Sequence, residues 1–308
     1  MTKSDTGYYG KNTLPVTGGQ ELTKQDVLSH LKDIINSGYF SLLPDYSDLF
    51  IYSRGDFSSE IVFDVPFSDT GNWDWHNGKT GNVIPTMSAP AGYTGSLIGG
   101  GWALFIPSQS LAEEFEPGDL RKDATIISVE KLLEDGSRLE ARYQHTGMFT
   151  NKYTLHPENF PPSGGFSGLN DPLNFHLIRY ADVLLMAAEL DMGSDAINWI
   201  NQVRNRAGLG NISSVDIDVI YHERRVELAL EGVRYWDVLR RGLDYASEKL
   251  TVQNYQMRPP TDPTEPLTGD LGNPKDFERV FDKSKLGFLP IPQYEMDVNT
   301  NFVQNAGY

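Results

Sequence analysis

The sequence contains no cysteine among its 308 residues. Disulfide bonds, thiolate catalysis and cysteine-based zinc or iron–sulfur sites are therefore excluded. It also lacks any run of about 18 consecutive apolar residues, so no transmembrane helix is predicted. The residues that follow Met1 are polar and include no apolar core of a signal peptide, so no export signal is predicted in this sequence.

Positive charge is scarce relative to negative charge. The chain carries 26 Lys and Arg residues against 42 Asp and Glu residues, which gives a formal net charge of -16. Such a charge repels the phosphates of nucleic acids and of anionic lipids. Neither nucleic acid nor an anionic membrane surface is therefore an expected electrostatic partner.

Motifs of the common catalytic classes are missing as well. The six histidines are scattered, with no H-E-x-x-H pattern, and the sequence has no G-x-S-x-G elbow and no G-x-x-x-x-G-K-[ST] phosphate loop. A glycosidase needs two carboxylates that flank a cleft. The acidic residues could supply them, but no motif marks a pair. We therefore expect no catalytic residue, no metal and no cofactor.

Apolar residues at helical spacing predict three successive helices between Phe175 and Gly242. The first is His176–Leu190, which is apolar on nearly all sides. The second is Ala196–Ala207, which Gly208 ends. The third, Asp216–Arg241, is long and has two apolar rows, which indicates burial against several neighbours; one row is Val226, Leu230 and Val233, and the other is Tyr221, Leu228, Tyr235 and Leu239.

The predicted third helix is also crowded with charge: Glu223, Arg224, Arg225, Glu227, Glu231, Arg234, Asp237, Arg240 and Arg241. Glu231–Arg234 and Asp237–Arg241 have the spacing of pairs along one helix. We interpret the set as a buried ion-pair lattice that joins helices. Catalytic carboxylates are the less favoured alternative, because nearby arginines would hold them ionised. Gly232 costs about 1 kcal/mol relative to alanine inside a helix, so we expect another backbone to approach it closely.

These helices carry a family resemblance. The blocks RYADVLLMAAEL, AINWINQVRNRAGL and ERRVELALEGVRYWDVLRRG, followed by LGFLPIPQYEMDVNTNFVQNAGY, resemble in order and spacing the SusD/RagB family of cell-surface glycan-binding lipoproteins of Bacteroidetes. The resemblance implies a mainly α fold, with a helical TPR-type core, long irregular loops and a few short β-strands. It also implies that residues 1–308 form a single SusD-like domain, the C-terminal part of the family fold, without the N-terminal TPR-like half of family members.

The sequence before the three helices predicts shorter elements. One helix begins after Thr23, which is a capping-box N-cap with Asp26 three residues later, and Gly38 ends it. Glu60–Pro66 alternates apolar and polar residues and is predicted to be a strand. Leu111–Phe115 is predicted to be a short helix.

Three further segments complete the prediction. Thr125–Glu130 and Arg138–His145 flank a turn sequence and are predicted to form a hairpin. Tyr255–Asp282 is polar and rich in proline, and we interpret it as a surface excursion. Prolines in the tail Leu286–Tyr308 favour an extended chain that packs back on the helices.

The segment Phe67–Gly101 is long for a loop and rich in Gly, Ser, Thr, Asn and Pro, and long loops of this kind are usually functional. Its candidate ligand-binding residues are Trp73, Trp75, His76, Asn77 and Tyr93. Aromatic rings stack on the apolar face of a sugar, while Asn and His hydrogen-bond its hydroxyls. The alternative is that these aromatic residues fix the loop to the core. Trp102, where the loop ends, is interpreted in this structural way.

Two weaker candidates lie elsewhere. The loop His156–Asn174 is full of turn-forming residues, and its possible ligand contacts are His156, Phe160 and Phe166. A charged turn contains Asp119, Arg121 and Asp123. We interpret this turn as a local ion-pair cluster, with a calcium site as the second choice.

The resemblance implies a non-enzymatic protein that binds oligosaccharides or polysaccharides, of starch or another glycan type, at the cell surface. It implies delivery of the glycan to a SusC-like TonB-dependent transporter of the outer membrane, with attachment to that membrane through a lipid anchor absent from this sequence. Two alternatives stay open. One is a scaffold subunit of a nutrient-uptake complex that has no complete ligand site, and the other, less favoured, is a carbohydrate-active hydrolase.

Overall fold

A computed structural model describes residues 13–15, 19, 21–68, 80–140, 145–159, 167–257 and 275–308. In these residues the α-helices are α1 (Lys24–Asn36), α2 (Tyr52–Gly55), α3 (Ile84–Ser88), α4 (Gln109–Ala112), α5 (Arg121–Thr125), α6 (Val129–Leu133), α7 (Tyr180–Asp191), α8 (Ser194–Arg206), α9 (Ile217–Glu227), α10 (Arg234–Arg240), α11 (Leu243–Leu250) and α12 (Gln293–Val298). Short 3-10 helices are η1 (Ser47–Phe50), η2 (Pro157–Asn159), η3 (Ser167–Leu169) and η4 (Lys283–Lys285).

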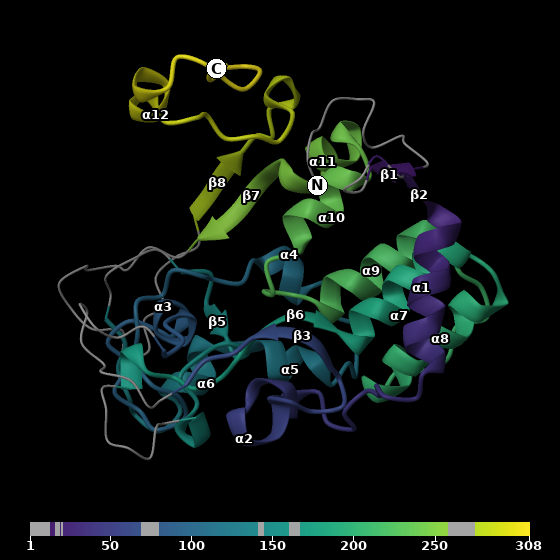
Figure 1. The fold of residues 1–308 in the computed structure, drawn as a ribbon. Coiled ribbons are helices and arrows are strands. Elements are labelled where there is room, and N and C mark those ends of the chain that lie inside the picture. Colours follow the sequence, from purple (N-terminus) through teal and green to yellow (C-terminus); the bar gives the residue numbers. More distant parts are fainter. Residues whose placement is uncertain are drawn as a thin grey trace.

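The strands are β1 (Thr13–Pro15), β2 (Glu21–Thr23), β3 (Ile61–Val65), β4 (Ile126–Ser128), β5 (Met148–Thr150), β6 (Phe175–Arg179), β7 (Val252–Met257) and β8 (Lys275–Arg279). They pair as four separate two-stranded antiparallel sheets, β1–β2, β3–β6, β4–β5 and β7–β8 (Figure 1). Helices dominate, and this confirms the predicted fold class. Within the described residues, no helix has the length and apolarity needed to cross a membrane.

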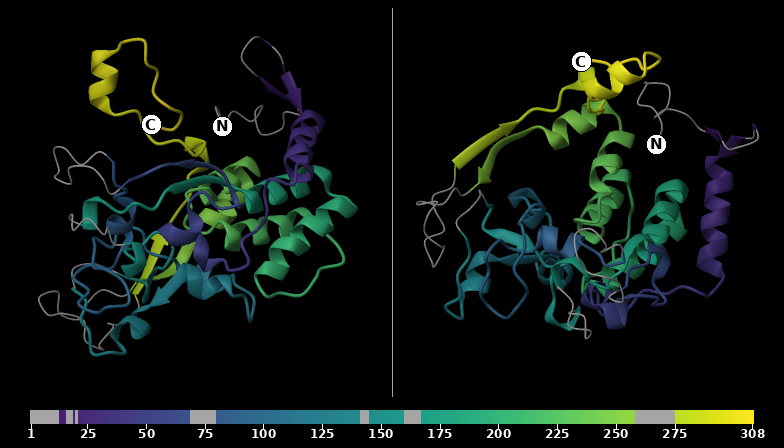
Figure 2. Two further views of the ribbon diagram at one scale, coloured as in Figure 1. Left: turned by 60° about the horizontal axis from the view of Figure 1, so that its bottom comes forward. Right: turned by 60° about the vertical axis from the view of Figure 1, so that its left-hand side comes forward.

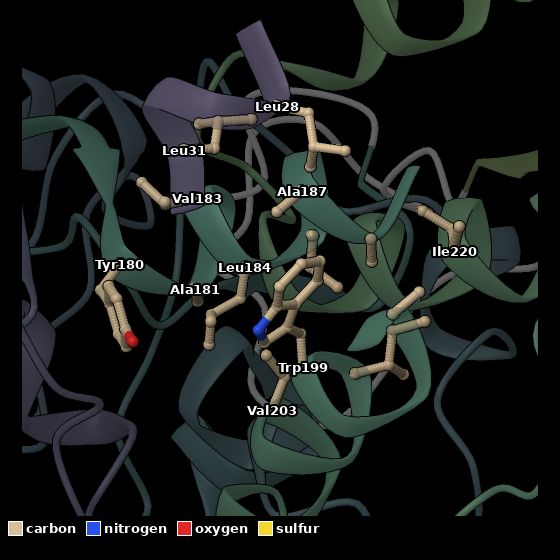
Figure 3. Close-up of a cluster of buried hydrophobic side chains, with 14 of the residues drawn as sticks. Leu28, Leu31, Tyr180, Ala181, Val183, Leu184, Ala187, Trp199, Val203 and Ile220 are labelled. Atoms are coloured by element: carbon tan, nitrogen blue, oxygen red, sulfur yellow. The ribbon is translucent and has the colours of Figure 1, made fainter. Parts of the chain in front are cut away.

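Helices α1, α7, α8 and α9 form the core of the molecule, with α7 packed against each of the other three. The side chains that meet between them include Leu28 from α1, Leu184 from α7, Trp199 from α8 and Ile220 from α9 (Figure 3). Leu184 and Ile220 are fully buried, and each such side chain contributes about 1.5–3 kcal/mol to stability. The apolar all-round pattern of α7 therefore reflects its central position.

The start of α1 confirms the prediction made from its cap residues. The Asp26 N–H donates to Thr23 Oγ1 at 3.1 Å, and the Thr23 N–H donates to Asp26 Oδ2 at 2.8 Å. Gly38 follows the helix with φ of 72°. Both signals are local in sequence, which is why they could be recognised without the fold.

The first predicted helix was wrong at its beginning. His176–Arg179 belongs to β6, which pairs with β3, and α7 begins only at Tyr180. The strand buries His176 and Arg179 and leaves Leu177 44% exposed. The prediction counted Leu177 in an apolar helical row and so began the helix too early. The segment is a strand because it pairs with β3, which lies far earlier in the chain. The strand predicted at Glu60–Pro66 is confirmed as β3.

The predicted long helix is two helices. Helix α9 ends at Glu227 and α10 begins at Arg234, and Leu230 and Gly232 between them have left-handed φ values of 63° and 81°. A Cβ added to Gly232 would meet nothing within 4 Å, so the expected close approach of another backbone was wrong. Gly232 supplies a backbone conformation that other residues adopt at a cost.

The predicted hairpin is also corrected. Strand β4 pairs with β5 instead, and Val129–Leu133 is helix α6. The Ser128 side chain caps that helix by accepting from the Lys131 N–H at 3.1 Å, a local signal that the strand pattern obscured. The predicted short helix at Leu111–Phe115 exists as α4 but begins earlier, after Ser108.

The C-terminal segment contacts α10 near its beginning. The Tyr235 hydroxyl donates to the Gly287 carbonyl, and a Cβ on Gly287 would meet Leu239. Beyond this point Leu289 and Val303 are 80% and 83% exposed, and Figure 2 shows the segment standing away from the helical core. The prediction that the whole tail packs on the helices was therefore wrong. The preceding surface excursion contains β7 and β8.

Candidate functional site

The predicted loop Phe67–Gly101 contains helix α3, and the residues on either side of its aromatic part, residues 69–79, are joined by one hydrogen bond. The Ser68 N–H donates to the Thr80 carbonyl at 2.7 Å. Four predicted ligand residues, Trp73, Trp75, His76 and Asn77, lie between these two positions, in residues 69–79 outside the described part of the chain. Their role in binding a sugar stays a prediction.

The second predicted loop ends beside the first. Asn82 donates from its backbone N–H to the Asp171 carbonyl and from Nδ2 to the Leu173 carbonyl, both at 2.8 Å. One turn further, the Thr86 hydroxyl donates to the Gly168 carbonyl. Phe160 and Phe166 fall within residues 160–166, which the structure does not describe, and His156 Nε2 lies 2.8 Å from the Asn151 carbonyl. The flanks of residues 69–79 and the end of the second loop, residues 167–174, thus lie together along one edge.

Asn174 joins the same edge to the strands below it. Its Oδ1 accepts from the Phe67 N–H at 2.8 Å, its Nδ2 donates to Asp64 Oδ2 at 2.7 Å, and its N–H donates to Asp56 Oδ2 at 3.0 Å. The residue is fully buried, so each of these bonds replaces one that water would otherwise make. Asn174 therefore fixes where the aromatic loop leaves the fold.

Two buried carboxyl groups beneath this edge have perturbed pKa values. Burial raises the pKa of Asp171 to about 7, against the opposing hydrogen bond from the Leu173 N–H. Burial likewise raises the pKa of Asp56 to about 7. The Asp56 side chain is 2% exposed and Asp171 is 1% exposed, so neither group can reach a substrate. The pair therefore does not form a glycosidase site in spite of its shifted pKa values.

Tyr93, the fifth predicted ligand residue, is 7% exposed. Its ring packs in a second apolar cluster with Ile98, Val129, Leu132, Leu139 and Phe149. A stacking contact between this ring and a sugar would require its neighbours to move. Trp102 is 38% exposed. Its backbone N–H donates to the Thr86 carbonyl at 2.9 Å, which joins the end of the long loop to α3.

An aromatic-lined pocket of about 430 Å³ opens next to the loop edge. Its walls include α3, which lies within the predicted loop Phe67–Gly101, β6, which follows the second loop, and α10. The aromatic side chains that line it are Phe105, Tyr153, Phe175 and Tyr235. Sequence reasoning missed Phe105 and placed Tyr235 in a buried row. Treating Gly232 as a helix break, three residues earlier, would have identified Tyr235 as a residue near a surface.

The predicted ion-pair lattice is confirmed, and it lies in the centre of the molecule. Its acids are Asp119, Glu60, Glu223, Glu227 and Glu231, and its cations are Arg121, Lys152, Arg179, Arg204 and Arg206. Most partners come from different elements, and neither of the predicted pairs Glu231–Arg234 and Asp237–Arg241 forms. Glu231 pairs with Arg179 and Lys152, and Asp237 pairs with Arg224 and Arg240.

The electrostatics of this lattice favour structure over catalysis. Burial alone raises the pKa of Glu227, but the charges of Arg206, Arg179 and Arg121 outweigh it and lower that pKa below its ordinary value. The same balance, with Arg179 and Lys152, lowers the pKa of Glu231. Acids held ionised in this way are poor proton donors and are already occupied as acceptors.

The charged turn around Asp119 belongs to the lattice. Asp119 accepts from Arg121 Nε at 2.9 Å and from Nη2 at 2.7 Å, so both carboxylate oxygens are used by the arginine. The predicted ion pair is thereby confirmed for these two residues. Among the described residues, no group of three or more His, Asp or Glu side chains is arranged to bind a metal ion.

The fold defines a class of protein, namely a mainly helical scaffold with short two-stranded sheets. A family model described as the SusD family matches residues 133–308, which is more than half of the chain. The chain belongs to the SusD family, and this confirms the resemblance inferred from its sequence blocks.

Individual relatives agree with this assignment. A SusD-like protein of Bacteroides ovatus is 26% identical over 240 residues, which make up 72% of this chain and 40% of the relative. A solved laminarin binding SusD-like protein superposes with a TM-score of 0.75 at 28% identity, covering 92% of this chain and 59% of its own. Surface glycan-binding protein A from Bacteroides thetaiotaomicron, in complex with laminarihexaose, gives a TM-score of 0.73 at 28% identity over 92% of this chain and 60% of its own.

The chain thus spans roughly half the length of the proteins that it matches. The two solved structures are described as proteins that bind glycans. This agrees with the prediction that the chain is not an enzyme.

Proposed function

We propose that this chain binds an oligosaccharide without cleaving it, through the aromatic loop between Ser68 and Thr80. The observation that supports the proposal most directly is the single edge where both flanks of the aromatic loop meet the end of the second polar loop. The neighbouring structures suggest laminarin-type glucans as the first ligands to test, with starch-type glucans as the alternative.

The chemistry of the loop suits a sugar. Trp73 and Trp75 offer flat apolar surfaces to the C–H face of a pyranose, and His76 and Asn77 offer donors and acceptors to its hydroxyls. The Ser68–Thr80 bond and the contacts of Asn174 fix the base of the loop. A fixed base lowers the entropy that the loop loses when it binds a ligand.

In this proposal the protein acts at the surface of the outer membrane and passes its glycan to a SusC-like TonB-dependent transporter. Solved relatives named as surface glycan-binding proteins support the location. The transporter is proposed from the family resemblance alone, and co-purification of the two proteins from native membranes would test it.

A panel of oligosaccharides tests the binding function. Laminarihexaose, maltohexaose and cellohexaose are titrated into the purified chain by calorimetry, and released reducing ends are measured in the same samples. Saturable binding of at least one glycan with no release of reducing ends supports the proposal. Release of reducing ends would instead identify a hydrolase. Failure of every glycan to bind, with the helical circular dichroism spectrum intact, would contradict the proposal.

One observation favours the scaffold alternative. Large apolar side chains of the C-terminal segment are exposed to an unusual degree: Leu289 by 80%, Tyr294 by 74%, Val298 by 67% and Val303 by 83%. Exposed apolar surface of this kind is typical of protein contacts. A chain that assembles with a partner yet binds no glycan would fit that alternative.

A further inference from the structure

A second cavity lies on the other side of Leu230 from the aromatic-lined pocket. Its volume is about 480 Å³, within the usual range for small-molecule sites, and its lining residues come from α4, the link from α9 to α10, α11 and the β7–β8 sheet. Leu230 and Arg234 border both cavities.

The charge of this cavity is opposite to that of the protein as a whole. The chain has a formal net charge of -16, yet the cavity lining contains Arg225, Arg234, Lys249 and Arg279 and a single acid, Glu278. Ser108 and Ser110 add two hydroxyl groups. Charges of one sign in a concave site focus the potential inside it.

Two of these cations have partners of their own. Arg225 pairs with Glu114 and donates from Nη2 to Ser110 Oγ at 3.0 Å. Lys249 pairs with Glu248 at 2.8 Å, where both side chains are largely open to water. Water screens the second pair, so it compensates little of the charge in the cavity.

Neither Arg234 nor Arg279 makes a side-chain hydrogen bond or ion pair with any residue that the structure describes, and of these two only Arg234 is partly buried, since Arg279 is exposed. Glu231, its expected helical partner, is occupied by Arg179 and Lys152. Burial lowers the pKa of Arg234, and the nearby charge of Arg225 lowers it further. Electrostatic interactions with Tyr245, Glu114 and Asp237 oppose this effect. A partly buried guanidinium without an anion is costly unless a ligand supplies one.

We propose that this cavity is a binding site for an anionic group, a carboxylate or a sulfate, and that Arg234 is the residue that pairs with it. The planar fork of an arginine matches the two oxygens of either group. Arg225 and Lys249 contribute positive potential, and the serine hydroxyls can donate to the remaining oxygens. The anion is either an acidic sugar residue of a glycan or a free inorganic ion. This site is separate from the aromatic loop, so its test does not depend on the proposed function.

Titration of the full chain with matched probes tests the proposal. Sodium sulfate is compared with sodium chloride at equal ionic strength, and glucuronic acid is compared with glucose, with calorimetry as the measurement. Saturable binding of sulfate or glucuronic acid, with no binding of chloride or glucose, is the expected result. Affinity for glucuronic acid at least ten-fold above that for sulfate would identify an acidic sugar as the source of the anion. Equal affinities would identify a free ion.

Three variants decide whether Arg234 carries the effect. Arg234→Gln should weaken binding at least ten-fold, and Arg234→Lys, which keeps the charge and loses the fork, should weaken it less. Arg138→Gln removes the same charge from an exposed position outside the cavity and should bind like the wild type. Without anion, Arg234→Gln should unfold at the same temperature as the wild type or higher, because the repulsion from Arg225 is gone. Unchanged binding by Arg234→Gln, equal loss in Arg138→Gln, or no saturable binding of either probe would overturn the proposal.

Discussion

Arg179, the last residue of β6, forms a two-pronged ion pair with Glu231 in the turn between α9 and α10. Nε donates to Oε2 and Nη2 donates to Oε1, both at 2.9 Å, and Lys152 Nζ donates to the same Oε1 at 2.8 Å. Both members of the Arg179–Glu231 pair are almost fully buried. The pair therefore joins β6, the strand that follows the second loop, to the turn whose residue Leu230 lines both cavities.

Removing this acid should be strongly destabilising. In Glu231→Ala the buried charges of Arg179 and Lys152 lose a common partner, and breaking a buried pair in this way costs about 3–5 kcal/mol. Urea unfolding of the variant measures the loss. Glu134→Ala, which breaks the exposed pair with Lys131, is the matched control and should leave stability nearly unchanged. Similar midpoints for the two variants would show that the lattice does not stabilise the fold.

The ion-pair lattice shows which part of the structure could be predicted from the sequence. The abundance of charge on an apolar segment indicated buried pairs, and the lattice exists. Its pairing could not be predicted, because Arg179 and Glu60 reach Glu227 and its partners from distant parts of the chain. Local spacing favours Glu231–Arg234, whereas the fold gives Glu231 to Arg179. Local signals such as the cap at Thr23 were sufficient because they involve only neighbours in sequence.

The same distinction applies to the candidate site. Trp73 and Trp75 were identified by composition, which needs no fold. The sequence did not predict that Arg234 and Tyr235 lie near the surface. A continuous helix through Gly232 would have buried both side chains against the core. Left-handed backbone at Leu230 and Gly232 breaks that helix and turns both side chains toward cavities.

Gly232 should be sensitive to the smallest substitution. With φ of 81° and nothing within 4 Å of an added Cβ, Gly232→Ala meets no neighbour and costs only the strain of the left-handed backbone, about 1–2 kcal/mol. Thermal unfolding monitored by circular dichroism measures it. Gly210→Ala is the control, since that glycine also has open space around it and no left-handed φ. Equal stability of the two variants would contradict the strain argument.

Asp171 should make stability depend on pH in a defined window. The folded protein keeps the proton of this carboxyl up to about pH 7, whereas the unfolded chain releases it near the ordinary aspartate pKa of 3.8. The contribution of Asp171 to stability therefore falls as pH rises between these values. Asp171→Asn lacks this titration. As pH rises from 5 to 8, the unfolding free energy of the wild type should therefore fall by about 2–3 kcal/mol relative to that of the variant.

Urea unfolding of wild type and Asp171→Asn at several pH values gives this difference, which includes the electrostatic interaction of Asp171 with Asp56. Asp33→Asn changes an exposed carboxyl, with 77% of its side chain accessible, and should show a constant difference from the wild type. A constant difference for Asp171→Asn as well would mean that Asp171 titrates normally in the folded protein.

The central claim is that the aromatic loop binds the glycan, and one comparison tests it most directly. Calorimetric titration of the best glycan from the panel is repeated with Trp73→Ala, Trp75→Ala and Tyr39→Ala, the last removing an 83% exposed aromatic ring that follows α1. Loss of a stacking ring should weaken binding at least about ten-fold, which corresponds to about 1.4 kcal/mol. We predict that loss for one or both tryptophan variants, with unchanged circular dichroism, and wild-type affinity for Tyr39→Ala. Wild-type affinity in both tryptophan variants would contradict the account and move the glycan site away from this loop.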